Sequence, residues 1–216
     1  MTGTIDEAPP RVRGSNAARR AATREKLLNA CVKHLAKHGY YATSTVMVAE
    51  LAGVSRGAML HQFPTKLDLM IATAEHISHS FGQARKPKLT PIDDPHKRFE
   101  VLLDIIWEET RTPSGIALLE IMMATRSDPQ LAERLADQRD HIDQQRADSM
   151  WRLAQKLGVK DRAAVDAMVT FDTAALRGLS VSAMFIGKPK QIDAALDLLR
   201  EYRRLMLAKL VTNAEK

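Results

Sequence analysis

The chain has 216 residues, of which 45% are apolar and 27% charged, and its formal net charge is +6. This apolar content is enough for a buried core in one domain or two modest ones. No run of about 18 uncharged apolar residues occurs, which excludes a membrane-spanning helix, and the single cysteine excludes an internal disulfide.

The charge is divided unevenly along the chain. Residues 1–66 contain 10 Lys and Arg against 4 Asp and Glu, whereas the remaining residues contain 22 of each sign. The whole positive excess therefore lies in the first third of the chain. Such a segment attracts phosphates; the alternative is a basic solvated tail.

Residues 1–15 mix proline, glycine and charge without periodicity, which predicts an N-terminal arm that is disordered when free. Arg11 and Arg13 in this arm could enter the minor groove of DNA, where the potential is most negative over A·T-rich steps. The arm carries acidic residues and prolines where a signal peptide would carry its apolar segment, so we expect a cytoplasmic protein.

A first helix is predicted from Asn16 to Lys37, with His38-Gly39 as its stop signal. Its apolar positions follow helical spacing: Leu27, Leu28, Cys31, Leu35 and Ala36. Because Cys31 falls in register with this stripe, we predict that it is a core residue.

The segment from Ser44 to Lys66 has the pattern of two short helices separated by one tight turn. Ser44 and Ser55 are placed to cap the two helix starts, and Gly53 tolerates the left-handed backbone that the turn needs. The second helix, Arg56 to about Gln62, would enter the major groove. This pattern predicts a helix-turn-helix, a unit that reads DNA.

Beyond Lys66 every segment with a readable period is again helical, beginning with a helix from Lys66 to about Phe81. Breaks are predicted at Pro87 to Pro95, Thr112-Pro113, Asp128-Pro129, Gly158 and Gly187 to Pro189. The stretch Ser127-Asp128-Pro129-Gln130 has capping-box spacing. We predict an all-α protein of about nine helices, with an arm over 1–15, a helix-turn-helix domain over 16–66 and a ligand-binding and dimerisation domain over 67–216.

The middle helices carry apolar and methionine-rich stripes, which are typical of plain core and also suit an adaptable cavity. Three polar residues are predicted to continue the buried face of a long helix around 130–157, namely Gln138, Gln145 and Ser149. Asp172 either pairs with a base such as Arg177, lies at the surface, or meets a polar or cationic ligand. The predicted ligand-binding residues are Leu103, Trp107, Leu119, Met122, Met123, Gln145, Ser149 and Asp172.

The last two helices, about Asp161–Ile186 and Pro189–Val211, have more apolar surface than one packing partner needs. Small residues on the first of them would let helices approach closely, which suits a two-fold four-helix interface. We predict a homodimer through Leu176, Leu179, Ala183, Leu196, Leu199, Tyr202 and Met206.

The segment from Arg20 to about Met70 resembles the DNA-binding domain of TetR-type (TetR/AcrR) transcriptional regulators. The resemblance rests on Gly39-Tyr40, Thr43-Ser44, Val48-Ala49, Ala52-Gly53-Val54-Ser55, Gly57, Phe63, Lys66 and Leu69. It implies that Ser44 and Lys66 meet phosphates, while Arg56, Ala58 and His61 face bases or flanking phosphates. The predicted DNA-binding set is Ser44, Thr45, Ser55, Arg56, Gly57, Ala58, His61, Gln62 and Lys66, with Arg11 and Arg13.

Two residues depart from the family pattern, and the first, Met47, stands where an acidic capping partner is common. Leu60 stands where a tyrosine usually donates its hydroxyl to a phosphate, so that contact is absent unless His61 or Gln62 replaces it. Phe63 is predicted to lock the second helix to its neighbours as a core residue.

Other chemistry is weakly indicated. His76 and His79 have a spacing that can bind metal, but no third ligand accompanies them and no metal is expected. No phosphate loop or nucleophile motif occurs, so the chain is not expected to be an enzyme.

Together with these patterns, the resemblance to TetR-type regulators implies a dimeric repressor that binds a palindromic operator and is released by a small-molecule effector, with no cofactor. One alternative is a DNA-binding protein without a ligand. The other is a helical small-molecule-binding protein or enzyme with a vestigial helix-turn-helix.

Overall fold

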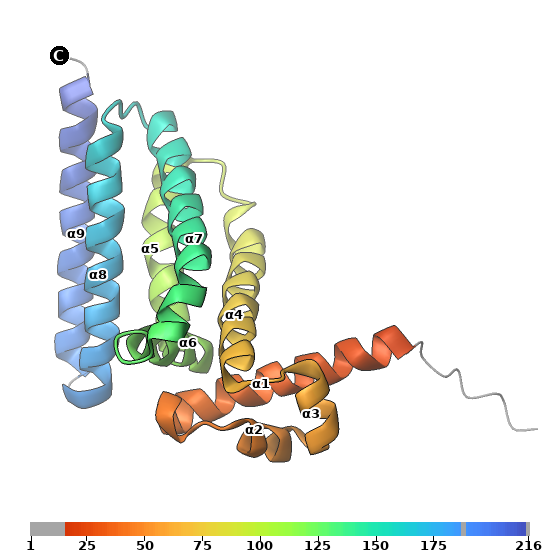
Figure 1. Ribbon diagram of the computed structural model, residues 1–216. Coiled ribbons are helices and arrows are strands. Elements are labelled where there is room, and N and C mark those ends of the chain that lie inside the picture. The colour runs from red at the N-terminus through yellow and green to blue at the C-terminus, as the bar shows by residue number, and fades with distance from the viewer. Residues whose placement is uncertain (1–15, 187–188, 215–216) are drawn as a thin grey trace, which may run out of the picture.

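The computed structural model describes residues 16–186 and 189–214, and this part of the chain consists of nine helices without a strand (Figure 1). The predicted all-α fold is confirmed. The helices are α1 (Asn16–Ala42), α2 (Thr45–Ala52), α3 (Arg56–Gln62), α4 (Lys66–Leu89), α5 (Pro95–Arg111), α6 (Pro113–Ala124), α7 (Pro129–Lys156), α8 (Arg162–Ile186) and α9 (Pro189–Ala214).

The first three helices and the start of α4 enclose one apolar core. In Figure 1, α1 lies across the base of the molecule with α2 and α3 on its outer side, and α4 rises from the end of α3. Leu27, Cys31 and Leu35 of α1 are fully buried in this core together with Val48 and Phe63. Cys31 is thus a core residue as predicted, and burial raises the pKa of its thiol to about 11.

The same core continues into the second half of the chain. Ala117 and Ile121 of α6 and Leu131 of α7 belong to the cluster that contains the α1 residues. A new helix therefore begins at residue 66, but the apolar core is continuous on both sides of it.

The predicted stop at His38-Gly39 marks a kink within α1. Gly39 has φ 79°, outside the helical region, yet helical residues resume and end at Ala42. The backbone N–H of Tyr40 donates to Oε2 of Glu120 at 3.1 Å, and the Tyr40 side chain is buried. This anchoring to α6 explains why the chain stays ordered beyond the glycine.

The predicted end of α4 at Phe81 is wrong, since α4 continues to Leu89 with Pro87 inside its last turn. A proline there removes one helical hydrogen bond. The last turns are held instead by ion pairs with α5, from Arg85 to Glu109 and from Lys88 to Glu108.

The start of α7 also differs by one residue from the prediction. The N-cap is Asp128 and not Ser127, because Oδ1 of Asp128 accepts from the backbone N–H of Leu131 at 3.0 Å. Pro129 then occupies the first helical position, where its missing N–H costs nothing.

Helices α5, α7, α8 and α9 form the bundle that makes up most of the second half. Figure 1 shows α8 and α9 running antiparallel along its outer edge. Phe99 of α5 packs with residues of α7, α8 and α9 in one cluster, and Leu103 and Trp107 pack with Leu176 and Leu196 in another. Within the described residues, no helix is both long enough and apolar enough to cross a membrane.

Candidate DNA-binding and effector sites

The turn between α2 and α3 has the geometry that the sequence predicts. Oγ of Ser44 accepts from the backbone N–H of Met47 at 3.3 Å, and Oγ of Ser55 accepts from that of Ala58 at 3.3 Å. Gly53 adopts φ 63° and ψ 36°, the left-handed conformation that any other residue would adopt at a cost of roughly 1–2 kcal/mol. The two capped helix starts expose backbone N–H groups of the kind that bind anions.

Helix α3 presents an open face to solvent. Arg56, Gly57 and His61 are exposed and Ala58 is half-buried. A β-carbon built on Gly57 would meet no atom of the protein within 4 Å, so the backbone is accessible at this position. Leu60 lies on the same face with 43% of its surface exposed, where an apolar side chain can contact a thymine methyl but cannot donate to a phosphate.

Two residues of the predicted DNA-binding set make contacts inside the protein. Nζ of Lys66 donates to the backbone oxygen of Tyr40 at 2.8 Å and lies 4.2 Å from the centre of its ring. Burial lowers the pKa of Lys66. Nε2 of Gln62 donates to the backbone oxygen of Arg20 at 3.2 Å. Each would have to leave this partner to reach a phosphate.

The remaining residues of the predicted DNA-binding set lie at the starts of α2 and α3 or outside the described part of the chain. Ser44 and Thr45 are half-buried at the start of α2, and Ser55 is exposed at the start of α3. Arg11 and Arg13 lie outside the described residues, so their predicted role in the minor groove stays a prediction.

The exposed face of α3 is supported from behind by Phe63 and Met59, which are both fully buried. The guanidinium of Arg24 in α1 lies 4.6 Å from the centre of the Phe63 ring. The prediction that Phe63 is a core residue is confirmed, and α3 is fixed against α1 by both contacts.

A polar junction joins this unit to α6 and α7. The hydroxyl of Tyr40 donates to Oδ2 of Asp128 at 2.8 Å, and the hydroxyl of Tyr41 contacts that of Ser127. Nη1 of Arg134 in α7 pairs with Oδ1 of Asp68 in α4 at 3.0 Å. Movements of α6 and α7 can therefore be transmitted to both α1 and α4.

The predicted ligand-binding residues are not brought together at one cavity. Leu103 and Trp107 are buried in an apolar cluster, while Leu119 and Met122 are half-buried. Met123 is 60% exposed on α6.

The prediction that Gln145 and Ser149 continue the buried face of α7 is wrong, since both are exposed. Gln145 contacts the ring of His141 at 2.8 Å, and Ser149 donates to the backbone oxygen of Gln145 at 2.7 Å. In a helix of 28 residues an apolar stripe drifts around the helix axis. The spacing of apolar residues at one end of α7 therefore does not show which residues are buried at the other end.

Asp172 is buried and pairs with Arg203 of α9, not with Arg177. Oδ2 of Asp172 lies 2.9 Å from Nε of Arg203, whose side chain is only 3% exposed. Arg203 also donates to the backbone oxygen of Phe99 at 3.1 Å. Burial raises the pKa of Asp172 to about 6, although the charge of Arg203 opposes this shift.

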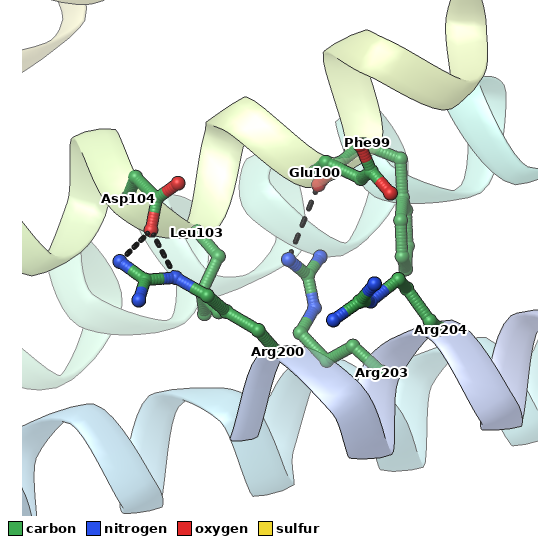
Figure 2. Close-up of a pocket in the computed structure, with 7 residues that line it drawn as sticks. All are labelled: Phe99, Glu100, Leu103, Asp104, Arg200, Arg203 and Arg204. Carbon is green, nitrogen blue, oxygen red and sulfur yellow. Dashed lines mark hydrogen bonds and ion pairs between the residues drawn. The ribbon is translucent and has the colours of Figure 1, made fainter. Parts of the chain in front are cut away.

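A groove between α5 and α9 adjoins this pair (Figure 2). Its volume is about 180 Å³, and a neighbouring hollow of about 350 Å³ shares Phe99, Glu100 and Arg204 with it. Figure 2 shows that Arg200 closes one end by pairing with Asp104. The groove is lined by residues of α5 and α9 and by none of α4, the helix that follows α3.

The predicted dimer residues are partly internal. Leu176, Leu196 and Leu199 are buried within the chain, so their assignment to a dimer interface is wrong. Leu179, Tyr202 and Met206 are half-buried and Ala183 is exposed. The sequence reasoning missed the large apolar side chains that are exposed on these helices, namely Phe171, Met184, Phe185, Leu198 and Leu205. On α9 the spacing 198, 202, 205 marks a second stripe beside the buried one.

Sequence reasoning also missed an ion pair in the bundle. Nε of Arg85 donates to both carboxylate oxygens of Glu109, at 2.8 and 2.9 Å, and Glu109 is buried. The available signal was a charged residue in register with the apolar stripe of α5, the same signal that identified Asp172.

Comparison with known proteins adds to this geometry. The model of the family described as bacterial regulatory proteins, tetR family, matches residues 27–73, which include α2 and α3. The transcriptional regulator CymR of Pseudomonas putida is 36% identical over 124 residues, covering 56% of this chain and 60% of CymR. The repressor AcnR of Corynebacterium diphtheriae is 24% identical over 178 residues, covering 82% of this chain and 90% of AcnR.

Solved structures have the same fold. A transcriptional regulator of Saccharomonospora viridis in complex with choline matches with a TM-score of 0.68 and 19% identity, covering 84% of this chain and 95% of its own. A TetR transcriptional regulator of Chloroflexus aurantiacus matches with a TM-score of 0.71 and 16% identity, covering 86% of this chain and 96% of its own. The chain spans about 60% of the length of CymR, the first of these relatives. The chain is therefore similar to the tetR family of bacterial regulatory proteins over residues 27–73, and it shares its all-helical fold with the solved structures.

Proposed function

We propose that the protein is a homodimeric transcriptional repressor that binds a palindromic operator and releases it when a small molecule binds. The observation that carries this proposal is the capped, exposed helix α3, with Arg56 and His61 facing solvent. An arginine at such a position can donate two hydrogen bonds to guanine in the major groove. Positive charge concentrated in residues 1–66 supports the approach to DNA.

A dimer is supported by the exposed apolar side chains of α8 and α9. The rings of Phe171 and Tyr202 are in tilted contact with their centres 4.8 Å apart, and Leu198 and Leu205 lie along the same side of α9. Packing this surface against its copy would remove it from water and give an isologous four-helix interface. Two copies of α3 would then reach two half-sites of a palindrome.

Release of DNA by an effector is supported by the contacts between the halves of the chain. Lys66 at the start of α4 and Tyr40 near the end of α1 are bonded to one another, and Tyr40 is bonded to Asp128 at the start of α7. A ligand that binds one arrangement of the bundle better than another would shift the position of α3.

The comparisons support the same proposal. Two relatives are named as repressors, AcnR and NicS, and one solved neighbour holds choline. We propose that this protein acts in the cytoplasm, where bacterial DNA lies, and takes an effector but no cofactor.

Selection of bound fragments from sheared genomic DNA of the host tests this function. The purified protein is incubated with the fragments at two salt concentrations. Enrichment of one shared palindrome that persists at the higher salt is the expected result. Uniform recovery that collapses with salt would leave only phosphate attraction, and would favour a helical small-molecule-binding protein with a vestigial helix-turn-helix.

A further inference from the structure

The groove between α5 and α9 and the hollow beside it adjoin one another and share three lining residues, Phe99, Glu100 and Arg204. We call the two together the α5–α9 site. The larger hollow has a volume of about 350 Å³, which falls within the range of small-molecule pockets, roughly 300–1,000 Å³. The site therefore has room for a small ligand.

Most of the charged side chains that line the α5–α9 site have a partner within the protein. Nη2 of Arg200 donates to Oδ1 of Asp104 at 2.7 Å, and Nη1 of Arg200 donates to Asp197. Nε of Arg203 lies 2.9 Å from Oδ2 of Asp172. A ligand would have to compete with these partners for Arg200, Arg203 or Asp104.

Glu100 and Arg204 are the charged lining residues without a partner. Within the described residues neither of them forms an ion pair or a hydrogen bond, and both are exposed. They come from facing helices, since Figure 2 shows Glu100 on the α5 side of the groove and Arg204 on the α9 side. The site thus offers one free carboxylate and one free guanidinium that are not bonded to one another.

Apolar side chains lie beside these two free charges. Phe99 and Leu207 line the larger hollow and are buried, and Val211 lines it and is half-buried. Glu100 and Arg204 line the same hollow. An apolar group placed there would be removed from water while it stays next to both charges, and its burial would favour binding.

The α5–α9 site stays open in the proposed dimer. Because an α-helix turns once in about 3.6 residues, residues 200, 204, 207 and 211 share one side of α9. Residues 198, 202 and 205, which belong to the proposed dimer surface, lie on the opposite side. Each copy in the dimer would therefore keep its own site.

We propose that the α5–α9 site binds a zwitterionic α-amino acid with an apolar side chain. Arg204 binds its carboxylate, Glu100 binds its ammonium group, and the apolar hollow takes its side chain. Both polar contacts are charge-assisted hydrogen bonds, and a guanidinium matches a carboxylate in a bidentate arrangement. This binding does not depend on the proposed function, because every residue that it uses belongs to the bundle.

A ligand with charge of a single sign fits the α5–α9 site less well. An anion bound to Arg204 would also approach the carboxylates of Glu100 and Asp104. A cation bound to Glu100 would approach the three arginines that line the groove. A zwitterion offers an opposite charge to each free group, so neither is left without a partner in the complex.

Thermal melting of the full chain with matched probes tests this inference at fixed pH and ionic strength. L-leucine and L-phenylalanine carry all three groups, whereas 4-methylpentanoate lacks the ammonium, 3-methylbutan-1-amine lacks the carboxylate, and glycine lacks the side chain. We expect both complete amino acids to raise the melting temperature in a saturable way, since a ligand that binds the folded state stabilises it. Each incomplete probe should bind roughly tenfold more weakly than L-leucine.

Variants assign the two charged contacts. Glu100→Gln and Arg204→Gln should each weaken L-leucine binding roughly tenfold. Glu100→Gln should bind 4-methylpentanoate at least as well as the wild type does, and Arg204→Gln should do the same with 3-methylbutan-1-amine, because each change removes a repulsive charge. Glu201→Gln and Arg177→Gln make the same changes at exposed positions outside the site and should bind L-leucine as the wild type does.

Three results would overturn the inference. The first is no saturable shift with L-leucine or L-phenylalanine. The second is a shift with an incomplete probe that equals the shift with L-leucine at the same concentration. The third is undiminished binding of L-leucine by Glu100→Gln or by Arg204→Gln.

Discussion

The hydroxyl of Tyr40 donates a 2.8 Å hydrogen bond to Asp128, and this bond joins the last turn of α1 to the N-cap of α7. The bond from the Leu131 backbone and the bond from Tyr40 lower the pKa of Asp128. Asp128 thus serves both as a helix cap and as a link between the helix-turn-helix unit and the bundle. The backbone oxygen of the same tyrosine accepts a hydrogen bond from Lys66 of α4. Tyr40 therefore links three helices, α1, α4 and α7.

Tyr40→Phe removes only the hydroxyl of this link. We expect the free energy of unfolding to fall by about 1.5–3 kcal/mol, the usual range for a hydrogen bond to a charged group. Urea denaturation measures it. Tyr41→Phe is the control, because Tyr41 is 74% exposed and its hydroxyl meets only Ser127. Equal losses in the two variants would show that the Asp128 bond has no special role.

Arg56→Ala tests the face of α3. If Arg56 reads a base, specific binding should weaken by about 1–3 kcal/mol and discrimination at one operator position should relax. A fluorescence anisotropy titration against the operator and a scrambled duplex measures both effects. Arg204→Ala, an exposed arginine on α9, should change neither. An equal loss on both duplexes would mean that Arg56 touches only phosphate.

Leu60→Tyr should restore a phosphate contact that this chain lacks. The added hydroxyl should tighten binding to every duplex by about threefold to tenfold, the worth of one hydrogen bond. The salt dependence should stay the same, since no charge is added. Leu60→Phe supplies the ring without the hydroxyl and is the control. If Leu60→Phe tightens binding as much as Leu60→Tyr, the gain comes from apolar contact instead.

Leu205→Glu tests the dimer surface on α8 and α9. Leu205 is 64% exposed in the single chain, so a charge there leaves the fold intact but cannot be buried against a second copy. We expect sedimentation velocity to show a monomer. Met123→Glu places the same charge on an equally exposed apolar position of α6 and should remain dimeric. A dimer in both variants would refute the proposed interface.

The buried pair of Asp172 and Arg203 predicts a dependence of stability on pH. The pKa of Asp172 is raised from near 4 in the unfolded chain to about 6 in the folded one. The folded state therefore binds this proton more tightly than the unfolded state does. The stability that the bound proton contributes is lost as the pH rises from near 4 to about 6. Denaturation of the wild type and Asp172→Asn from pH 4 to 7 should show the wild type losing stability relative to the variant. A constant difference would contradict the shift.

Local signals in the sequence were sufficient to predict the fold of the helix-turn-helix unit. Ser44, Gly53 and Ser55 each act through the backbone of their own turn, so their roles follow from residue type and spacing. The burial of Cys31 follows from the apolar periodicity of α1, whereas Phe63, which caps the end of α3, was assigned to the core alongside the family resemblance. The assignment of DNA contacts to these positions remains a prediction.

The bundle was predicted less well because its contacts join distant parts of the chain. Arg203 pairs with Asp172 across 31 positions and Arg85 with Glu109 across 24, and no local pattern specifies such partners. The buried faces of α7 and α9 were also misassigned. The apolar stripe of α7 drifts around its long axis, and α9 has a second apolar stripe, so that only packing decides which of its two stripes is internal. Gln145 and Leu199 were therefore assigned to the wrong surfaces.

The stoichiometry of the protein on its selected palindrome tests the central claim most directly. Sedimentation equilibrium with a labelled duplex, repeated with one half-site scrambled, gives both the number of chains and the cost of losing a half-site. We predict two chains, or a multiple of two, on the intact palindrome and a large loss of affinity on the single half-site. One chain bound equally well to either duplex would contradict a dimeric operator-binding regulator.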